Sequence, residues 1–156
     1  MTRPFYGLIF LLPLLLSCFS RAEPEKHFIP DGYTGSIVII YGDSAGQEAN
    51  YENGFRVYKI PASGVLRTKF EHPKGWIADD KRQFFYYDSG RITPIKVIHE
   101  IQNHPIDEKD ETVYVFSFEE SVGTTRYLVG KLHDRERFIL QLRTRIDSLF
   151  PPQIIQ

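Results

Sequence analysis

The sequence predicts a mainly β protein: an antiparallel β-sandwich of about seven strands with a C-terminal amphipathic α-helix. Short runs of β-branched and aromatic residues recur along the chain, separated by Gly, Pro and Asn turn signals. Near the C-terminus the hydrophobic period changes to that of a helix. The chain has 156 residues, of which 42% are hydrophobic and 25% charged, and these values suit one folded domain.

The first 22 residues predict export. Arg3 precedes an apolar run over 5–16, which only a glycine and a proline interrupt. A basic start followed by a short apolar run is the layout of a secretory signal peptide, and this run is too short to span a bilayer. We therefore expect a signal peptide over 1–22.

Two cleavage sites compete within this segment. Ser20 and Ala22 are small residues at the positions that signal peptidase prefers for a cut after Ala22. The segment 15–18, Leu-Leu-Ser-Cys, resembles a bacterial lipobox, in which the cut precedes Cys18 and a lipid is attached to that cysteine. We favour the second site, because the single cysteine of the chain falls there. The expected location is the bacterial cell envelope, as a membrane-anchored lipoprotein, and the alternative is a soluble periplasmic or secreted protein.

Charge and cysteine content exclude some classes of function. The chain has 19 basic and 20 acidic residues, a formal net charge of −1, and cleavage leaves it at about −2 or −3. A nucleic-acid binder that depends on bulk positive charge is therefore excluded. One cysteine excludes an intrachain disulfide and a Cys-based zinc cluster, and we expect no cofactor.

The mature chain begins with a polar stretch over 23–28, which we expect to be a linker, and continues as a single β-rich domain over 29–150. Pro30 and two glycines punctuate a turn before 36–41, a β-branched run that is apolar on both faces. A strand of this kind is buried on both sides, so 36–41 predicts a central strand.

Turn signals define the next elements. Asn53-Gly54 predicts a tight turn, because both residues tolerate positive φ. Strands are expected at 55–60, which Pro61 ends, and at 65–70. Two further runs predict a hairpin whose three-residue loop, 88–90, suits a type I turn with a bulge. Its strands are 83–87 and 91–98.

The last third of the chain holds a loop, two strands and the helix. A polar stretch over 100–111 predicts the longest loop, and strands are expected at 112–118 and 126–130. Apolar residues then recur at helical spacing over 134–150. They are Phe138, Leu142, Ile146 and Leu149.

Asp134 is the expected N-cap of this helix, and Pro151 ends it before a tail over 151–156. Charges of both signs on the helix indicate a solvated face, with the apolar face packed on the sheet. A helix lying on a membrane surface is the alternative.

Two motifs carry a family resemblance. The turn Ile-Pro-Asp-Gly-Tyr-Thr-Gly at 29–35 and the segment 56–66 together cover roughly residues 28–98. They resemble an uncharacterised family of bacterial envelope-lipoprotein domains, and at fold level transthyretin-like and carboxypeptidase-regulatory sandwiches. The resemblance implies an exported, often lipid-anchored β-domain, and it carries no catalytic residues.

The histidines do not form a recognised metal motif. His99 and His104 are five residues apart, whereas two ligands on one helical face need a spacing of four. A loop-based pair with Asp107 or Glu108 as a third ligand is a hypothesis that the sequence does not favour, so we predict no metal site. The other three histidines lie next to turns, where we expect solvent: His27, His72 and His133.

No set of catalytic residues emerges. Asp79-Asp80 and Glu119-Glu120 are adjacent pairs, and on a strand their side chains point to opposite faces. The Gly-x-Ser-x-Gly motif of hydrolases does not occur. We therefore predict no catalytic residue, and a hydrolase assembled from distant loops remains the alternative.

Aromatic residues make up 14% of the chain. The run 84–87 places two of them on each face of one strand, so that one pair faces the core and the other solvent, or both are buried. Burial of both is the favoured interpretation, since aromatic side chains dominate small cores. An exposed platform for sugars or proteins is the alternative, with Trp76, Tyr86 and Tyr87 as binding candidates.

The sequence thus predicts a non-catalytic domain of the cell envelope that binds a protein or a polysaccharide, or supports envelope structure. A hydrolase acting on envelope material is one alternative, and a carbohydrate-binding module that uses exposed aromatic residues is another. The expected partners are an envelope protein or polysaccharide and the membrane through the lipid anchor, and no nucleic acid is expected.

Overall fold

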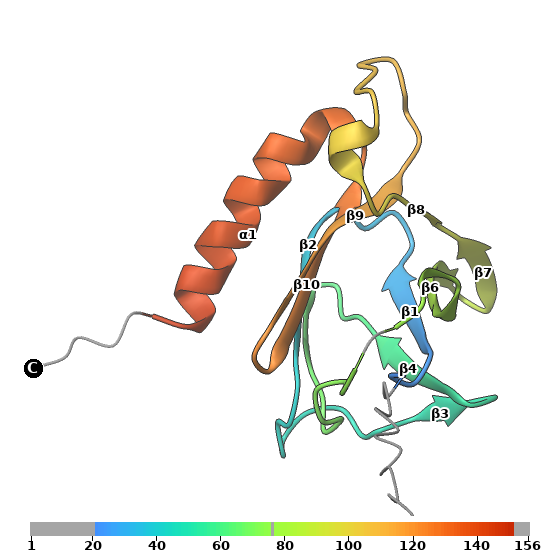
Figure 1. The fold of residues 1–156 in the computed structure, drawn as a ribbon, viewed down its shortest axis with the longest axis vertical. Helices are drawn as coiled ribbons and strands as arrows, with labels where there is room; N and C mark the ends of the chain where they lie inside the picture. The colour runs from blue at the N-terminus through green and yellow to red at the C-terminus, as the bar shows by residue number, and fades with distance from the viewer. Residues whose placement is uncertain (1–20, 76, 152–156) are drawn as a thin grey trace, which may run out of the picture.

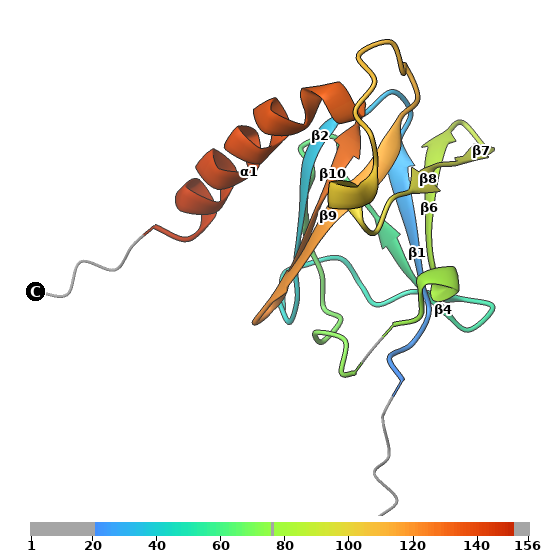
Figure 2. The same cartoon turned by 45° about the horizontal axis from the view of Figure 1, so that its top comes forward.

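The computed structural model describes residues 21–75 and 77–151 and arranges them in three layers. Two five-stranded sheets pack face to face, and one helix lies on the outside of the second sheet (Figures 1 and 2). The predicted signal peptide up to residue 20, with Cys18, lies outside the described residues, and so do Trp76 and the tail beyond 151. In the described part, no helix is long and apolar enough to cross a membrane.

Sheet I has the strand order β3-β4-β1-β6-β7. Its strands are β1 (Glu25–Pro30), β3 (Tyr51–Glu52), β4 (Phe55–Lys59), β6 (Arg82–Asp88) and β7 (Arg91–Pro94). Sheet II has the order β5-β2-β10-β9-β8. Its strands are β2 (Gly35–Ile40), β5 (Val65–Arg67), β8 (Lys96–Val97), β9 (Tyr114–Ser121) and β10 (Thr124–Gly130).

Both sheets are mixed, so the prediction of an antiparallel sandwich with about seven strands is wrong in detail. Strand β1 runs parallel to both of its neighbours, β4 and β6, and the pairs β2–β5 and β8–β9 are parallel as well. The chain passes repeatedly from one sheet to the other. A strand that returns to a sheet after such an excursion can run in the same direction as the strand it joins, which a direct hairpin cannot achieve.

The expected linker over 23–28 is also wrong, because β1 begins at Glu25 and occupies the centre of sheet I. Its inward-facing residues are Glu25, His27 and Ile29, all fully buried. Two of these three are polar, so the apolar alternation that marks a half-buried strand is missing from the sequence.

Several local predictions are confirmed. Asn53 and Gly54 form the tight turn between β3 and β4, with φ of 51° and 79°. The hairpin of β6 and β7 is present, but its loop has two residues and not three: Ser89 and Gly90 both have positive φ, and Asp88 pairs with Arg91. Positive φ at both central residues is the geometry of a type I′ turn, whose twist matches that of the strands.

The core lies between the two sheets, and a smaller apolar cluster lies under the helix. The predicted loop over 100–111 contains a short 3₁₀ helix, η2 (Ile101–Asn103). Two more 3₁₀ helices, η1 (Asp79–Lys81) and η3 (Leu132–Asp134), precede β6 and the α-helix.

Helix α1 (Arg135–Leu149) confirms the helical period. Asp134 occupies the N-cap position but makes no side-chain cap, and its carboxylate pairs with Arg137 at 3.0 Å. Phe138 is the buried anchor of the helix, whereas Leu140 is 65% exposed. The C-terminal end of α1 lies farther from the sheets than its start (Figure 1).

Two polar side chains of α1 complete its docking. Gln141 Oε1 accepts a hydrogen bond from the Ser36 N–H at 3.1 Å, and Arg145 donates to the Ser36 carbonyl. Strand β5 pairs with β2 only from Val38 onward, so these side chains bond backbone groups of β2 that lie beyond the end of β5.

Candidate functional site

Strand β1 has two chemically different faces, and each belongs to a candidate site. Glu25 and His27 face the interior between the sheets. Lys26, Phe28 and Pro30 alternate with them and face outward, on the side of sheet I that lies away from sheet II. The inner face leads to a buried polar network, and the outer face leads to an aromatic surface.

The buried network is centred on the Glu25 carboxylate. Arg82 Nε donates to Glu25 Oε2 at 2.9 Å, and the Tyr58 hydroxyl donates to Oε1 at 3.2 Å. The His27 ring bridges Glu25 and Tyr127, with Nε2 3.3 Å from Oε2 and Nδ1 3.0 Å from the tyrosine oxygen. The network therefore joins β1 to β4, β6 and β10.

Burial and charge fix the protonation of this network. Burial by itself raises the pKa of Glu25, but the hydrogen bond from His27 and the positive charge of Arg82 outweigh it and leave the pKa below its usual value. Burial lowers the pKa of His27 against the opposing effect of Glu25, so this histidine is neutral. A carboxylate only accepts, so Nε2 carries the proton and the Tyr127 hydroxyl donates to Nδ1.

The order hydroxyl, imidazole, carboxylate matches that of a nucleophile, its base and an orienting group. However, Tyr127, His27 and Glu25 are all completely buried in the sandwich, and burial also raises the pKa of the Tyr127 hydroxyl. A substrate cannot contact these atoms without separation of the two sheets. The arrangement therefore supports a structural role, and the prediction that His27 is solvated is wrong.

The outer face of sheet I carries a cluster of apolar and aromatic side chains. The alternation of each strand and the register between strands place outward residues on four adjacent strands. The apolar ones are Phe55 and Val57 on β4, Phe28 and Pro30 on β1, Phe85 and Tyr87 on β6, and Ile92 and Pro94 on β7. Lys26, Lys59 and Gln83 share this face with them, and the Lys26 ammonium lies over the Phe55 ring. We call the apolar set the aromatic face.

Ring geometry orders the centre of the aromatic face. Phe28 and Phe85 are register neighbours whose rings stack with centroids 5.6 Å apart and planes inclined by 23°. Tyr87 meets Phe28 edge to face, with centroids 6.2 Å apart. Two phenylalanines thus support each other, and Tyr87, which is 49% exposed, presents ring area to solvent.

Helix α1 does not cover this face. It contacts β2 and β10 of sheet II, so it lies on the opposite side of the molecule (Figure 2). A groove of about 480 Å³ follows the aromatic face, within the size range of small-ligand sites. Its lining is Phe28, Pro30, Glu52, Lys59, Ile60, Tyr87 and Ile92.

Glu52 and Lys59 are the charged residues of this groove. Both side chains are exposed, and within the described ranges neither takes part in an ion pair. The groove therefore offers an acceptor and a donor beside an aromatic ring, without a net charge of either sign.

Two of the predicted binding candidates, Tyr86 and Tyr87, lie on opposite faces of β6. Tyr87 lies on the aromatic face, whereas Tyr86 points inward, donates its hydroxyl to the Tyr33 carbonyl at 2.7 Å and packs against the core. Burial raises the pKa of Tyr86 to about 12. Strand β6 thus presents one aromatic pair to each side, and the favoured burial of both pairs is wrong. Trp76 and Cys18 lie outside the described residues.

The other candidate groups are dispersed. His99 lies 3.5 Å from Asp79 and stacks on Phe118, while His104 packs against Tyr114. Asp79 and Asp80 belong to η1 and not to a strand. Over 21–75 and 77–151, no group of three His, Cys, Asp or Glu side chains is arranged to hold a metal ion.

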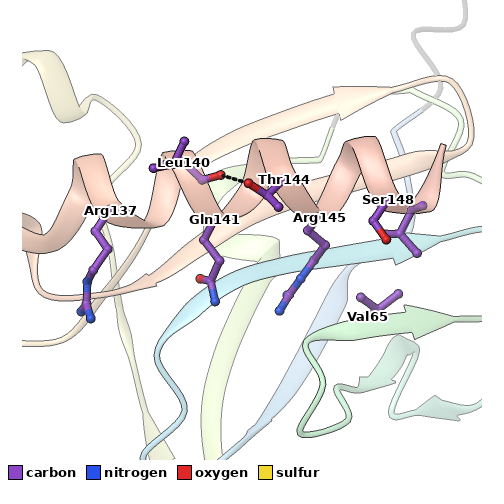
Figure 3. A pocket seen from close by; sticks show the side chains of 8 residues that line it. Val65, Arg137, Leu140, Gln141, Thr144, Arg145 and Ser148 are labelled. Atoms are coloured by element: carbon purple, nitrogen blue, oxygen red, sulfur yellow. Dashed lines mark hydrogen bonds between the residues drawn. The ribbon is translucent and has the colours of Figure 1, made fainter. Parts of the chain in front are cut away.

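A second groove, of about 600 Å³, runs between α1 and the edge of sheet II. Arg137, Gln141 and Arg145 project from the helix toward β2 along it (Figure 3). The polar atoms of Gln141 and Arg145 already bond Ser36, and Arg137 already pairs with Asp134. This groove therefore offers fewer unused polar groups than the groove on the aromatic face.

Phe28 and Phe85 were not among the predicted site residues. Phe28 was missed because 23–28 was interpreted as a linker. No local signal placed it on a strand, because two of the three inward-facing residues of β1, Glu25 and His27, are polar.

The model of a family of unknown function, DUF6843, matches residues 21–127, more than half of the chain, and the chain belongs to this family. No curated protein matches. A crystal structure from Bacillus anthracis, provisionally described as a lipoprotein, has 15% identity and a TM-score of 0.45, over 80% of this chain and 94% of its own. The likeness to transthyretin-like sandwiches stays a prediction.

Proposed function

We propose that this DUF6843 protein is a non-catalytic binding domain of the bacterial cell envelope, and that the aromatic face of sheet I is its binding surface. One observation carries the proposal: a cluster of apolar side chains crosses the outer face of four adjacent strands, with Tyr87, Ile92 and Pro94 exposed, and α1 packs on the other sheet. Clustered exposed apolar side chains of this kind are uncommon on monomeric proteins and mark interaction sites.

The location rests on the N-terminal segment. Both candidate cleavage sites precede Glu25, where β1 begins, so export by either route leaves every described strand in the mature protein. Attachment of lipid at Cys18 would place sheet I within a few residues of the membrane, because β1 is its central strand.

The location can be tested by metabolic labelling with a radioactive fatty acid. We expect the wild-type protein to incorporate label and to sediment with membranes, and the Cys18→Ala variant to lose both. A labelled Cys18→Ala protein, or an unlabelled wild type that is cut after Ala22, would contradict lipidation and leave the soluble alternative.

The binding surface can be tested by sedimentation of the purified protein with isolated bacterial cell envelopes. Tyr87→Ala removes the most exposed ring of the groove. Tyr51→Ala is a matched control, because Tyr51 is 51% exposed, also lies in sheet I and occupies the opposite face, beside Arg56 in the register. We expect Tyr87→Ala to lower the bound fraction about tenfold and Tyr51→Ala to leave it unchanged. Equal binding by wild type and Tyr87→Ala would refute this surface.

A further inference from the structure

We infer that the groove on the aromatic face binds a neutral polysaccharide chain, with a sugar ring stacked on Tyr87 and its hydroxyl groups bonded by Glu52 and Lys59. This inference rests on the proposed function and adds the chemical class of the ligand. Three features of the groove support it: the orientation of its rings, the unused pair of opposite charges, and its size.

The rings suit the apolar side of a sugar. The face of an aromatic ring carries partial negative charge and attracts the polarised C–H groups that a pyranose presents on one side. Phe28 and Phe85 stack on each other, so their faces are partly used. Tyr87 makes a T-shaped contact with Phe28 and is half-exposed, so its ring is supported on one side before a ligand arrives. A rigid ring loses little conformational entropy on binding.

The polar groups suit hydroxyls. A sugar hydroxyl both donates and accepts, so its recognition needs an acceptor and a donor at the same site. Glu52 supplies carboxylate oxygens and Lys59 supplies an ammonium group, and both line the same groove as Tyr87. Neither is engaged in an ion pair among residues 21–75 and 77–151, so both are available to a ligand.

Charge argues against other ligands. A nucleic acid or an anionic lipid surface needs clustered basic residues. Here Lys59 is matched by Glu52 in the groove, and at the neighbouring edge Arg91 pairs with Asp31 at 3.3 Å. Lys26 shares the face but lies outside the groove lining, with its ammonium over the Phe55 ring at 4.8 Å. The groove therefore gives a negatively charged ligand little electrostatic attraction. A neutral chain of hydroxyl groups finds in it both the donor and the acceptor that recognition of a hydroxyl needs.

The test uses two preparations of the same bacterial envelopes: intact envelopes, and wall polysaccharide freed of protein by exhaustive protease digestion and of lipid by detergent extraction. The purified wild-type protein is compared with Tyr87→Ala, Tyr87→Phe and Tyr51→Ala, after circular dichroism has shown that all four are folded. We expect Tyr87→Ala to bind the digested polysaccharide at least tenfold more weakly, and Tyr87→Phe and Tyr51→Ala to bind like wild type, because phenylalanine retains the stacking ring.

The outcomes separate the two proposals. If binding depends on Tyr87 but disappears after protease digestion, the partner is a protein, and the polysaccharide inference is overturned while the binding surface stands. If the wild-type protein self-associates in ultracentrifugation and Tyr87→Ala does not, a second copy occupies the face and the inference is again overturned. If binding to both preparations is independent of Tyr87, both proposals fail.

Discussion

Glu25 keeps its charge inside the protein because donors surround it. Its two oxygens accept from Arg82, Tyr58 and His27, and these partners come from β6, β4 and β1 itself. Burial of an ion is costly and is offset only where geometry and additional hydrogen bonds satisfy it. The network therefore favours the observed register of β1 between its two parallel neighbours. A shift of one residue would place this carboxylate on the outer face, away from its donors.

Removal of Arg82 tests the energetic weight of this network. Arg82 bridges Glu25 and Glu120, and the Arg82→Leu variant leaves a buried carboxylate without its cation. We expect the free energy of unfolding to fall by about 3–5 kcal/mol in denaturant titrations. Arg91→Leu removes an exposed pair with Asp31 and should cost less than about 1 kcal/mol. Similar small losses for both variants would show that the network contributes little.

His27 predicts a pH dependence of stability. Its pKa is lowered in the folded state from the usual value of 6.5, so the unfolded chain takes up a proton first as the pH falls. Stability should then decrease below about pH 6.5, by up to roughly 1.4 kcal/mol per pH unit. The pKa of Glu25 is also lowered, so its contribution is present above its unfolded pKa and is lost at more acidic pH.

Denaturant unfolding at pH 7.5 and 5.5 measures this effect. We expect the wild-type protein to be less stable at pH 5.5 than at pH 7.5. The His27→Gln variant should be less stable than the wild type at both pH values, but its stability should differ much less between them. His133→Gln is the control, because that histidine lies at the surface, and it should keep the wild-type difference. If the stability of His27→Gln differs between the two pH values as much as that of the wild type, a group other than His27 causes the pH dependence.

At the scale of elements, α1 is held to sheet II by the buried Phe138 ring, by Ile139 and Leu142 beside it, and by two polar side chains. The Phe138 ring lies over Gly130 at the end of β10, where a Cβ atom would come within 2.3 Å of the ring. Gln141 and Arg145 bond the backbone of Ser36 on β2. This close approach requires a residue without a side chain at position 130.

Gly130→Ala tests that requirement. We expect the added methyl group to displace Phe138 and loosen α1, with a loss of about 1–3 kcal/mol in unfolding free energy and faster hydrogen exchange of the α1 amides. Gly123→Ala controls for the backbone strain of a side chain at positive φ, because Gly123 and Gly130 have φ of 73° and 155° but a Cβ at Gly123 would meet nothing within 4 Å. It should leave the exchange of the α1 amides unchanged. Unaltered exchange in Gly130→Ala would mean that Phe138 does not anchor the helix.

The elements differ in how well the sequence predicts them. Strands β2, β4 and β6 and helix α1 each carry a local apolar period or turn signal, and all were predicted near their observed bounds. The expected strand 91–98 is divided: β7 ends at Pro94 in sheet I, and β8 continues in sheet II. Strand β1 has no such signal, because the partners of Glu25 and His27 lie 57 and 100 residues away along the chain. Parallel pairing also depends on distant segments, so local patterns led to an antiparallel sandwich.

Pairing between segments that are distant in the sequence also limits prediction of the site. Tyr87 could be named from the aromatic run of β6 alone. Its neighbour Phe28 comes from a strand that pairs with β6 in parallel, and Lys59 comes from a third strand in register with Phe28. Only the assembled sheet brings these residues onto one face.

At the scale of the molecule, the two outer surfaces differ. Sheet II is covered by α1, and sheet I presents its aromatic face on the other side (Figure 1). The proposed function requires that this face, which α1 leaves open, and not the groove beside α1, makes contact with the partner.

The position of the contact can be measured directly in ¹H–¹⁵N spectra of the labelled protein during titration with detergent-solubilised cell-envelope extract. We expect the amide signals that shift or broaden to belong to β1, β4, β6 and β7, around Phe28, Lys59 and Tyr87, and those of α1 not to change. Changes confined to α1 and the adjoining edge of sheet II, with sheet I unaffected, would contradict the proposed binding surface.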